Sequence, residues 1–460
     1  MQLKNILLLL LSCLTLLALV LVVSSSRKPR LRKHLNFHYV EVRQENAHYQ
    51  LYRNGIPYFI KGACVYKDFP LLKESGGNSI RLYNVNPDSA LMILDRAQKE
   101  GLTVTVGLNI TPAGTLDYSD EKAVAAQLKR IRQDVLKLKN HPALLMWGIG
   151  NELSFKLEFK HITEHYRLWT AVNDIAKMIH ELDPDHPTTT MISSDAKPLV
   201  LISLLCDEID ILSINIFDKM SEVLKFTIDW AWRGPYMASE YGPPGYWTAD
   251  HTDWYAKVEL TSYAKSQIIR KQYQELFANK SECLGSYAFL WSQKQEYTTT
   301  WFSLFTQTGQ PTEMIDALQY NWMNEWPVNR APSIASLIIN RQKNSKNTYL
   351  QGTLKKFKAI ITAKDFENDK LQLNWEVQKD NVEIYFDPTL AQNKPEIIVK
   401  GRLNYKTLQE NRLKTSSTTW QNYQLEVPSP SHEGPYRLFI YLTDEHNKVA
   451  TGNAAFYVTN

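Results

Sequence analysis

The sequence predicts an α/β protein in which a (β/α)8, or TIM, barrel is followed by a small all-β sandwich. Eight short apolar segments alternate with helical segments over roughly 270 residues, which matches the count, order and length of such a barrel. Most of the segments are rich in apolar residues, as expected of strands that are buried on both faces. After Pro327 the sequence changes to short alternating segments separated by turn residues, a pattern that is typical of a sandwich.

The eight expected barrel strands are short. They cover residues 58–66, 79–83, 102–108, 144–147, 188–193, 209–216, 236–239 and 286–291. An Asn54-Gly55 pair ahead of the first strand predicts a hairpin turn. A doubly wound open sheet is the alternative, but no Gly-rich phosphate-binding loop follows the first strand, so the barrel is favoured.

Three segments between the strands have clear helical character: residues 88–100, 121–139 and 161–182. In the second, apolar residues recur at steps of 4, 3, 4 and 3, as on one face of a helix: Val124, Leu128, Ile131, Val135 and Leu138. Pro184 ends the third.

The N-terminus carries an apolar run from Ile6 to Val23, broken only by Ser12, Cys13 and Thr15. The run is long for a signal-peptide core and just long enough to span a bilayer. A basic cluster after Ser26 argues against simple export. We expect residues 1–33 to be a signal peptide or a membrane anchor with a basic flank. The protein is then exported, periplasmic or extracellular, with anchorage to the membrane by residues 6–23 left open.

The net charge of +4 comes from this N-terminal segment. Residues 1–33 hold six of the 52 Lys and Arg residues and no acid, so the remainder has 46 basic against 48 acidic residues. Such a balance gives no basic surface for nucleic acid. The other cysteines, Cys64, Cys206 and Cys283, form no CxxC pair and are expected to be buried thiols. No HExxH or HxH grouping occurs, so no metal or other cofactor is predicted.

Two glutamates follow apolar strands. Glu152 comes after Leu144–Trp147 and two glycines, and Glu240 follows the seventh expected strand. Because parallel strands end at the same face of a barrel, both carboxylates would open on one mouth. The alternative for Glu152 is a solvated carboxylate at a helix N-terminus. Two carboxylates across a pocket suit cleavage of a glycosidic bond, since one protonates the leaving oxygen and the other attacks the anomeric carbon.

Several motifs carry a resemblance to a known family. NHPALLMWGIGNE (140–152) resembles the acid/base motif of glycoside hydrolase family 2 and its clan A relatives, and MASEYG (237–242) resembles their nucleophile motif. NGIPYFIKGACVY, GGNSIRLYN and AFLWSQ resemble the first, second and eighth barrel strands of that family. The similarity covers residues 49–326 and implies a retaining glycosidase.

The resemblance implies roles for individual residues. Glu152 would be the general acid/base and Glu240 the nucleophile. Asn151 would hydrogen-bond the sugar 2-hydroxyl, Arg81 would hold Glu240 ionised, and Trp291 would stack on the sugar. A purely structural ion pair and a core Trp are the alternatives for Arg81 and Trp291.

The sequence departs from the family pattern at the sixth strand. The family has Asn-x-Tyr there, whereas this chain has Asn215-Ile216-Phe217, so Tyr241 or Tyr83 would supply the missing hydroxyl. Asn109, which ends the third strand, and Asn215 complete the expected substrate-binding set.

The predicted function is a retaining β-glycoside hydrolase that acts on a poly- or oligosaccharide. A transglycosidase acting on envelope glycans and a catalytically impaired glycan-binding protein are the alternatives. The C-terminal segment resembles the immunoglobulin-like modules of bacterial glycosidases. We therefore expect a barrel domain over residues 34–330 and an immunoglobulin-like sandwich over residues 331–460. The sandwich would give support or glycan contact without chemistry.

Overall fold

The structure is a computed structural model that describes residues 29, 34–35, 38–46, 48–65, 68–84, 86–154, 161–195, 197–217, 221–278, 280–340, 346–413 and 419–460. The chain forms two compact units. The first comprises the residues up to Lys73, Gly77–Tyr241 and Leu276–Ala288, and the second comprises Glu74–Gly76, Gly242–Glu275 and Phe289–Asn460. Glu152 and Glu240 both belong to the first unit, whereas Trp291 belongs to the second.

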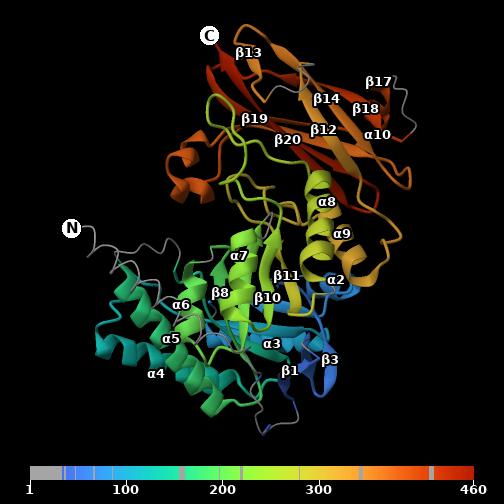
Figure 1. Cartoon of the computed structure of the whole chain (residues 1–460). Coiled ribbons are helices and arrows are strands. Elements are labelled where there is room, and N and C mark those ends of the chain that lie inside the picture. The colour runs from blue at the N-terminus through green and yellow to red at the C-terminus, as the bar shows by residue number, and fades with distance from the viewer. Residues whose placement is uncertain are drawn as a thin grey trace, which may run out of the picture. The chain divides into compact units, whose positions relative to one another are not determined.

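A closed barrel of eight strands organises the first unit (Figure 1). Its strands are β4 (Ile60–Val65), β5 (Ser79–Leu82), β6 (Thr103–Leu108), β7 (Leu144–Asn151), β8 (Thr188–Ser193), β9 (Ile211–Phe217), β10 (Tyr236–Gly242) and β11 (Cys283–Trp291). Each strand neighbours the next in the chain, and β11 neighbours β4. The barrel and its eight strands are therefore confirmed, with Glu152 after the fourth strand and Glu240 within the seventh.

The barrel strands are buried along almost their whole length. All six residues of β6 are buried, and so are five of the six residues of β8, which include three threonines. Their hydroxyls need partners inside the barrel. Thr189 Oγ1 lies 2.6 Å from Ser213 Oγ, and Thr190 Oγ1 donates to the Ile149 carbonyl at 2.8 Å. Threonine can therefore extend these strands without leaving a buried hydroxyl unsatisfied.

Helices connect the strands of the barrel. They are α2 (Phe69–Glu74), α3 (Pro87–Lys99), α4 (Glu121–Leu138), α5 (Ile162–Leu182), α6 (Lys197–Leu205), α7 (Glu222–Thr227), α8 (Ser262–Gln272) and α9 (Glu313–Met323), with π-helical turns η2 (Ile228–Trp232) and η3 (Tyr273–Phe277). The three predicted helices are α3, α4 and α5. Helix α4 begins where the Asp120 carboxylate accepts the backbone N–H groups of Lys122 and Ala123, a common N-terminal cap.

A small antiparallel sheet precedes the barrel, formed by β1 (Val40–Glu45), β2 (His48–Arg53) and β3 (Ile56–Tyr58). The predicted hairpin turn is present, with φ of +52° at Asn54 and +77° at Gly55. The single strand predicted over 58–66 is wrong, because Tyr58 ends β3 and Ile60 begins β4. A continuous apolar run does not reveal that the hydrogen-bond partner changes from β2 to β5.

The C-terminal part of the second unit is a two-sheet sandwich (Figure 1). One sheet has the order β12-β14-β18-β17 and the other β13-β20-β19-β15-β16. The strands are β12 (Ser333–Ile339), β13 (Tyr349–Gln351), β14 (Lys356–Lys364), β15 (Gln372–Lys379), β16 (Ile397–Leu403), β17 (Arg412–Leu413), β18 (Gln421–Pro428), β19 (Gly434–Thr443) and β20 (Val449–Thr459). Three short helices complete it: η4 (Val382–Tyr385), η5 (Pro388–Gln392) and α10 (Tyr405–Glu410). Inward-facing residues of both sheets form one apolar core.

The predicted N-terminal leader, apart from residue 29, lies outside the described residues, so its role in export stays a prediction. Among the described residues, no helix combines the length and apolar character needed to span a bilayer. Cys64, Cys206 and Cys283 are buried free thiols, as expected.

Candidate active site

Glu152 is presented by an irregular end of strand β7. The pairing of β7 with β8 shifts between Gly148 and Asn151, so β7 contains one extra residue there. Gly150 has φ +75°, and a Cβ at this position would meet Leu153 Cδ1 at 2.6 Å. Glu152 itself has φ +50°, an uncommon conformation for a residue with a side chain, and its N–H donates to the Met191 carbonyl at 2.9 Å. The chain is thus bent where the carboxylate leaves the strand.

Glu240 occupies a similar position on strand β10. The register between β10 and β11 shifts between Ala238 and Tyr241, which places Glu240 within the irregular stretch. Only 7% of the residue is exposed. Its Oε1 accepts hydrogen bonds from Arg81 Nη1 at 2.8 Å and from the Tyr83 hydroxyl at 2.9 Å. No described residue donates to Oε2, so one oxygen is anchored and the other is left for chemistry.

Arg81 joins Glu240 to the end of β7. The guanidinium is buried in the barrel interior and donates through Nη1 to the Ser239 carbonyl at 2.8 Å as well as to Glu240. Its Nη2 donates to Asn151 Oδ1 at 2.6 Å. A planar fork can bind two groups at fixed separation, which a lysine could not do. Arg81 thereby fixes the nucleophile candidate relative to Asn151.

Asn215 links Glu152 to Asn151 and Ser239 from the side of β9. Its Nδ2 donates to Glu152 Oε1 at 2.9 Å and to Asn151 Oδ1 at 3.3 Å. Its Oδ1 accepts from Ser239 Oγ at 2.8 Å. Arg81 Nη2 and Asn215 Nδ2 both donate to Asn151 Oδ1, so the Asn151 Nδ2 group can still donate to a sugar hydroxyl. Residues on or next to strands β5, β7, β9 and β10 thus contribute to one hydrogen-bonded group.

Burial raises the pKa of Glu240. The Arg81 guanidinium and the Tyr83 hydroxyl oppose this rise, and the nearby Glu152 carboxylate adds to it. Arg81 is also buried, but the negative groups around it keep its pKa above the ordinary value, so it stays a cation. The predicted contact between Arg81 and Glu240 is present, although burial outweighs its effect on the pKa.

Tyr83 supplies the hydroxyl that the sixth strand lacks. It lies two residues after Arg81, and the Arg81 guanidinium sits 4.4 Å from the centre of its ring. Tyr241 is not brought to the group, since it follows Glu240 directly and its fully buried ring packs edge-on against Phe277 at 5.0 Å. Alternate strand residues face opposite sides, which explains the difference.

The other two predicted residues are not linked to this group. Asn109 is exposed after β6, and its backbone carbonyl accepts from Arg130 Nη2 at 2.6 Å. Trp291 is fully buried in the second unit and packs against Phe305 and Trp322, with ring centres 5.7 and 6.3 Å apart. Their contact with sugar stays a prediction.

Two residues of the group were missed in the sequence. Ser239 holds the Asn215 amide and offers its carbonyl to Arg81, and Cys64 Sγ donates to the same carbonyl at 3.5 Å. Burial raises the pKa of the Cys64 thiol to about 12, so it remains neutral. The sequence indicates that Cys64 and Ser239 lie on strands, but it does not show that these two strands bring the Cys64 thiol to the Ser239 carbonyl.

Comparison with known proteins identifies the family. Residues 36–325 match the family model of the TIM barrel domain of glycosyl hydrolases family 2. Since this is more than half of the chain, the chain belongs to glycosyl hydrolase family 2. No curated protein sequence matches it significantly.

Solved structures with the same fold include two bacterial glycosidases. A Bacteroides uniformis β-glucuronidase 2 is 16% identical with a TM-score of 0.50, over 91% of this chain and 48% of its own. A family 2 β-galacturonidase from Eisenbergiella tayi is 17% identical with a TM-score of 0.50, over 64% of this chain and 55% of its own. The chain thus spans about half the length of these structures, and at this identity they show a shared fold.

Proposed function

We propose that this protein is a retaining β-glycoside hydrolase acting on a poly- or oligosaccharide, with Glu240 as nucleophile and Glu152 as general acid/base. The observation that carries the proposal is the difference between the two carboxylate oxygens of Glu240. Its Oε1 is held by Arg81 and Tyr83, while Oε2 accepts no hydrogen bond from the described residues. A nucleophile needs one oxygen that is held in place and one that is free to attack, and Glu240 has both.

In the first step, Glu240 Oε2 attacks the anomeric carbon. A bond forms between that oxygen and the carbon as the glycosidic C–O bond breaks, and the Glu152 carboxyl gives its proton to the departing oxygen. Asn215 orients Glu152 through its 2.9 Å hydrogen bond to Oε1. The Asn151 amide donates to the 2-hydroxyl of the sugar, an interaction that strengthens as the transition state forms.

In the second step, Glu152 acts as a base. It removes a proton from water, the water oxygen bonds to the anomeric carbon, and Glu240 leaves as a carboxylate that Arg81 and Tyr83 stabilise. Two displacements at one carbon return the β-configuration. A sugar hydroxyl in place of water would yield a lengthened glycan, which is the transglycosidase alternative.

Aryl β-glycosides and β-linked oligosaccharides test the proposal, with products followed by mass spectrometry. The protein should release shortened sugars. Glu240→Gln should reduce kcat by about 10⁴- to 10⁶-fold, and Glu152→Gln by about 10²- to 10⁴-fold with natural leaving groups. With an aryl group that leaves without protonation, the first step of Glu152→Gln should be spared.

The possible outcomes separate the alternatives. Lengthened sugars would identify a transglycosidase with the same two carboxylates. Glycan binding without turnover, unchanged by Glu240→Gln, would identify a binding protein and reject the proposal. Turnover that survives Glu240→Gln would reject the assignment of the nucleophile.

A further inference from the structure

An exposed group of aromatic rings lies in the second unit, outside the group around Glu240. It consists of His251, Tyr255, Tyr385 and Phe386, which we name the aromatic platform. Tyr255 and Tyr385 are each 40% exposed and Phe386 is 70% exposed. Contiguous exposed rings of this kind commonly mark a binding surface in soluble proteins.

The rings of the platform touch one another. The ring centres of Tyr255 and Tyr385 are 4.6 Å apart, and Phe386 lies 5.2 Å from each of them. His251 lies 5.6 Å from Tyr255 and 5.2 Å from Tyr385. Two segments distant in the sequence, 251–255 and 385–386, therefore contribute to one aromatic surface.

The segment that carries Tyr255 is held rigidly. His251 and Lys257 form an antiparallel bridge, and Val258 N–H donates to the Asp250 carbonyl at 2.8 Å. Tyr255 has φ +68°, a strained conformation for a bulky aromatic residue, although its ring is 40% exposed. Such strain at an exposed ring gives no folding advantage, whereas a preorganised ring binds with a smaller loss of entropy.

The charges around the platform restrict the ligand. Four exposed acids lie within or close to the two segments in the sequence: Asp250, Asp253, Glu383 and Asp387. Lys257, two residues after Tyr255, is buried. Its Nζ donates to the Ala249 carbonyl at 3.2 Å and lies 5.1 Å from the centre of the Tyr385 ring. This surface would repel an acidic polymer or an anionic membrane, since exposed charges act over about 10 Å at ordinary salt. Carboxylates that flank aromatic rings can accept hydrogen bonds from sugar hydroxyls.

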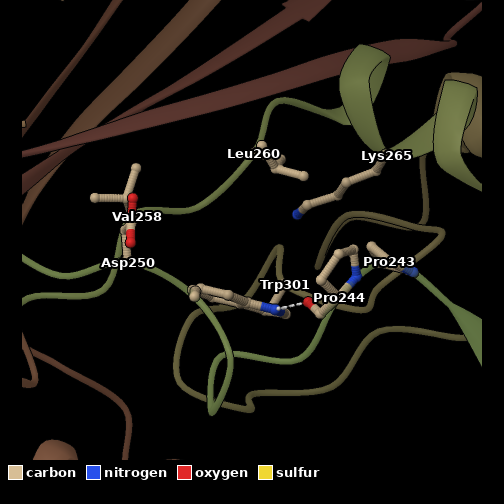
Figure 2. A pocket seen from close by; sticks show the side chains of 8 residues that line it. Pro243, Pro244, Asp250, Val258, Leu260, Lys265 and Trp301 are labelled. Atoms are coloured by element: carbon tan, nitrogen blue, oxygen red, sulfur yellow. Dashed lines mark hydrogen bonds between the residues drawn. The ribbon is translucent and has the colours of Figure 1, made fainter. Parts of the chain in front are cut away.

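Asp250 and Val258, at the two ends of the segment that carries Tyr255, also line a cavity of about 210 Å³. Figure 2 shows Leu260 and Lys265 on the opposite side of this cavity from Trp301. Two polar groups in its wall are already paired, since Lys265 Nζ donates to Glu259 at 2.5 Å and Trp301 Nε1 donates to the Pro244 carbonyl at 2.9 Å. The volume is that of about seven waters, enough for one small ring with an apolar face.

We propose that the aromatic platform binds a neutral glycan chain, with sugar rings stacked on Tyr255, Tyr385 and Phe386. This inference rests on the proposed function, because that function is the reason for choosing a glycan as the ligand and not another polyol. It names the substrate class as a neutral polysaccharide.

Binding is tested on the full chain carrying Glu240→Gln, so that no turnover is needed. Native-gel retardation is measured with mixed-linkage β-glucan and β-mannan as neutral polymers and with polygalacturonate as an acidic one. At least one neutral polymer should retard the protein. Tyr385→Ala combined with Phe386→Ala should weaken that retardation about tenfold.

Tyr405→Ala is the matched control, because Tyr405 is 43% exposed on α10 of the same unit. It should leave retardation unchanged, and both variants should keep the melting transition of the parent. Equal effects of the two variants would overturn the proposal, as would platform-dependent binding of polygalacturonate or binding of none of the neutral polymers.

Hydrolysis of an aryl β-glycoside by the same platform variant, with Glu240 restored, separates this proposal from the proposed function. Unchanged kcat/KM on the aryl glycoside with weakened polymer binding supports both. Aryl glycoside hydrolysis that is absent in the parent rejects the proposed function, while the retardation assay still decides the platform.

Discussion

Two buried ion pairs in this molecule look alike but differ in how their carboxylates are hydrogen-bonded. Arg81 and Glu240 in the first unit approach to 2.8 Å, and Lys265 and Glu259 in the second unit approach to 2.5 Å. None of the four side chains is more than 9% exposed. The difference lies in how the remaining carboxylate oxygen is used.

Glu259 is satisfied on both oxygens. Its Oε1 accepts from Lys265 Nζ and from Thr300 Oγ1 at 2.8 Å, and its Oε2 accepts from Thr298 Oγ1 and Asn453 Nδ2, both at 2.6 Å. Glu240 accepts two hydrogen bonds, both at Oε1. Glu259 is thus hydrogen-bonded on both oxygens, whereas Glu240 keeps one oxygen that accepts no hydrogen bond from the described residues, as the proposed function requires of a nucleophile.

The pKa directions follow from this difference. Burial acts to raise both pKa values. For Glu259 the cations and donors outweigh burial, and the pKa lies below its ordinary value. For Glu240 burial prevails, Glu152 adds to it, and the pKa lies above its ordinary value. Ionised Glu259 therefore stabilises the fold, whereas ionised Glu240 is kept at a cost to stability.

The largest expected effect is on the structural pair. Glu259→Gln leaves the Lys265 ammonium buried without a counter-charge, which should lower the free energy of unfolding by about 3–5 kcal/mol. Calorimetry would show a lower melting temperature for the transition of the second unit. Glu259→Gln combined with Lys265→Met should recover part of the loss, and an unchanged melting temperature in the single variant would refute the comparison.

The next effect is on catalysis. Arg81→Lys keeps the charge but cannot bind Glu240 and Asn151 with one fork, so kcat should fall by about 10²- to 10³-fold. Steady-state kinetics on an aryl β-glycoside measures this change. Arg130→Lys, on the exposed face of α4, serves as a control that should retain activity. If kcat is kept in Arg81→Lys, then Arg81 serves only the fold.

Tyr83→Phe should produce a smaller loss, with kcat falling by about 10- to 100-fold. The hydroxyl lowers the pKa of Glu240, so its removal should raise that pKa further. The proposed mechanism requires ionised Glu240, and the acidic limb of the kcat/KM pH profile should therefore move to higher pH. Phe217→Tyr in the Tyr83→Phe background should restore part of kcat, because Phe217 lies two residues after Asn215 on the same face of β9.

The smallest effect is on stability at the catalytic pair. Because the pKa of Glu240 is raised in the folded protein, its ionisation removes stability as pH rises above the ordinary carboxyl value of about 4.3. Glu240→Gln should thus melt a few degrees higher than the parent at pH 7. That advantage should vanish near pH 4. A lower melting temperature at pH 7 would mean that the Arg81 pairing outweighs burial.

Much of this arrangement could be predicted from the sequence. Buried parallel strands read as continuous apolar runs, so Glu152 and Glu240 could be placed at the ends of the fourth and seventh strands. Arg81 within an apolar strand signalled a buried partner. The choice between Tyr83 and Tyr241 was left open, although the period-two rule could have settled it, since Tyr83 shares a face with Arg81 and Tyr241 opposes Glu240.

Other features depend on packing that the sequence does not encode locally. The division between β3 and β4 rests on a change of hydrogen-bond partner within one apolar run. Ser239 on β10 and Cys64 on β4 come together because both strands neighbour β11 in the closed barrel. The aromatic platform unites residues more than a hundred positions apart, so no local pattern predicts it.

The central claim is that Glu240 Oε2 forms a bond with the sugar. A slow-turnover aryl 2-fluoro-β-glycoside of the preferred sugar would trap that intermediate, and the mass of the intact protein and of its peptides would be measured. The account predicts one added sugar, located on Glu240, and none in Glu240→Gln. An adduct on another residue, or hydrolysis that yields the α-anomer as first product without any adduct, would contradict it.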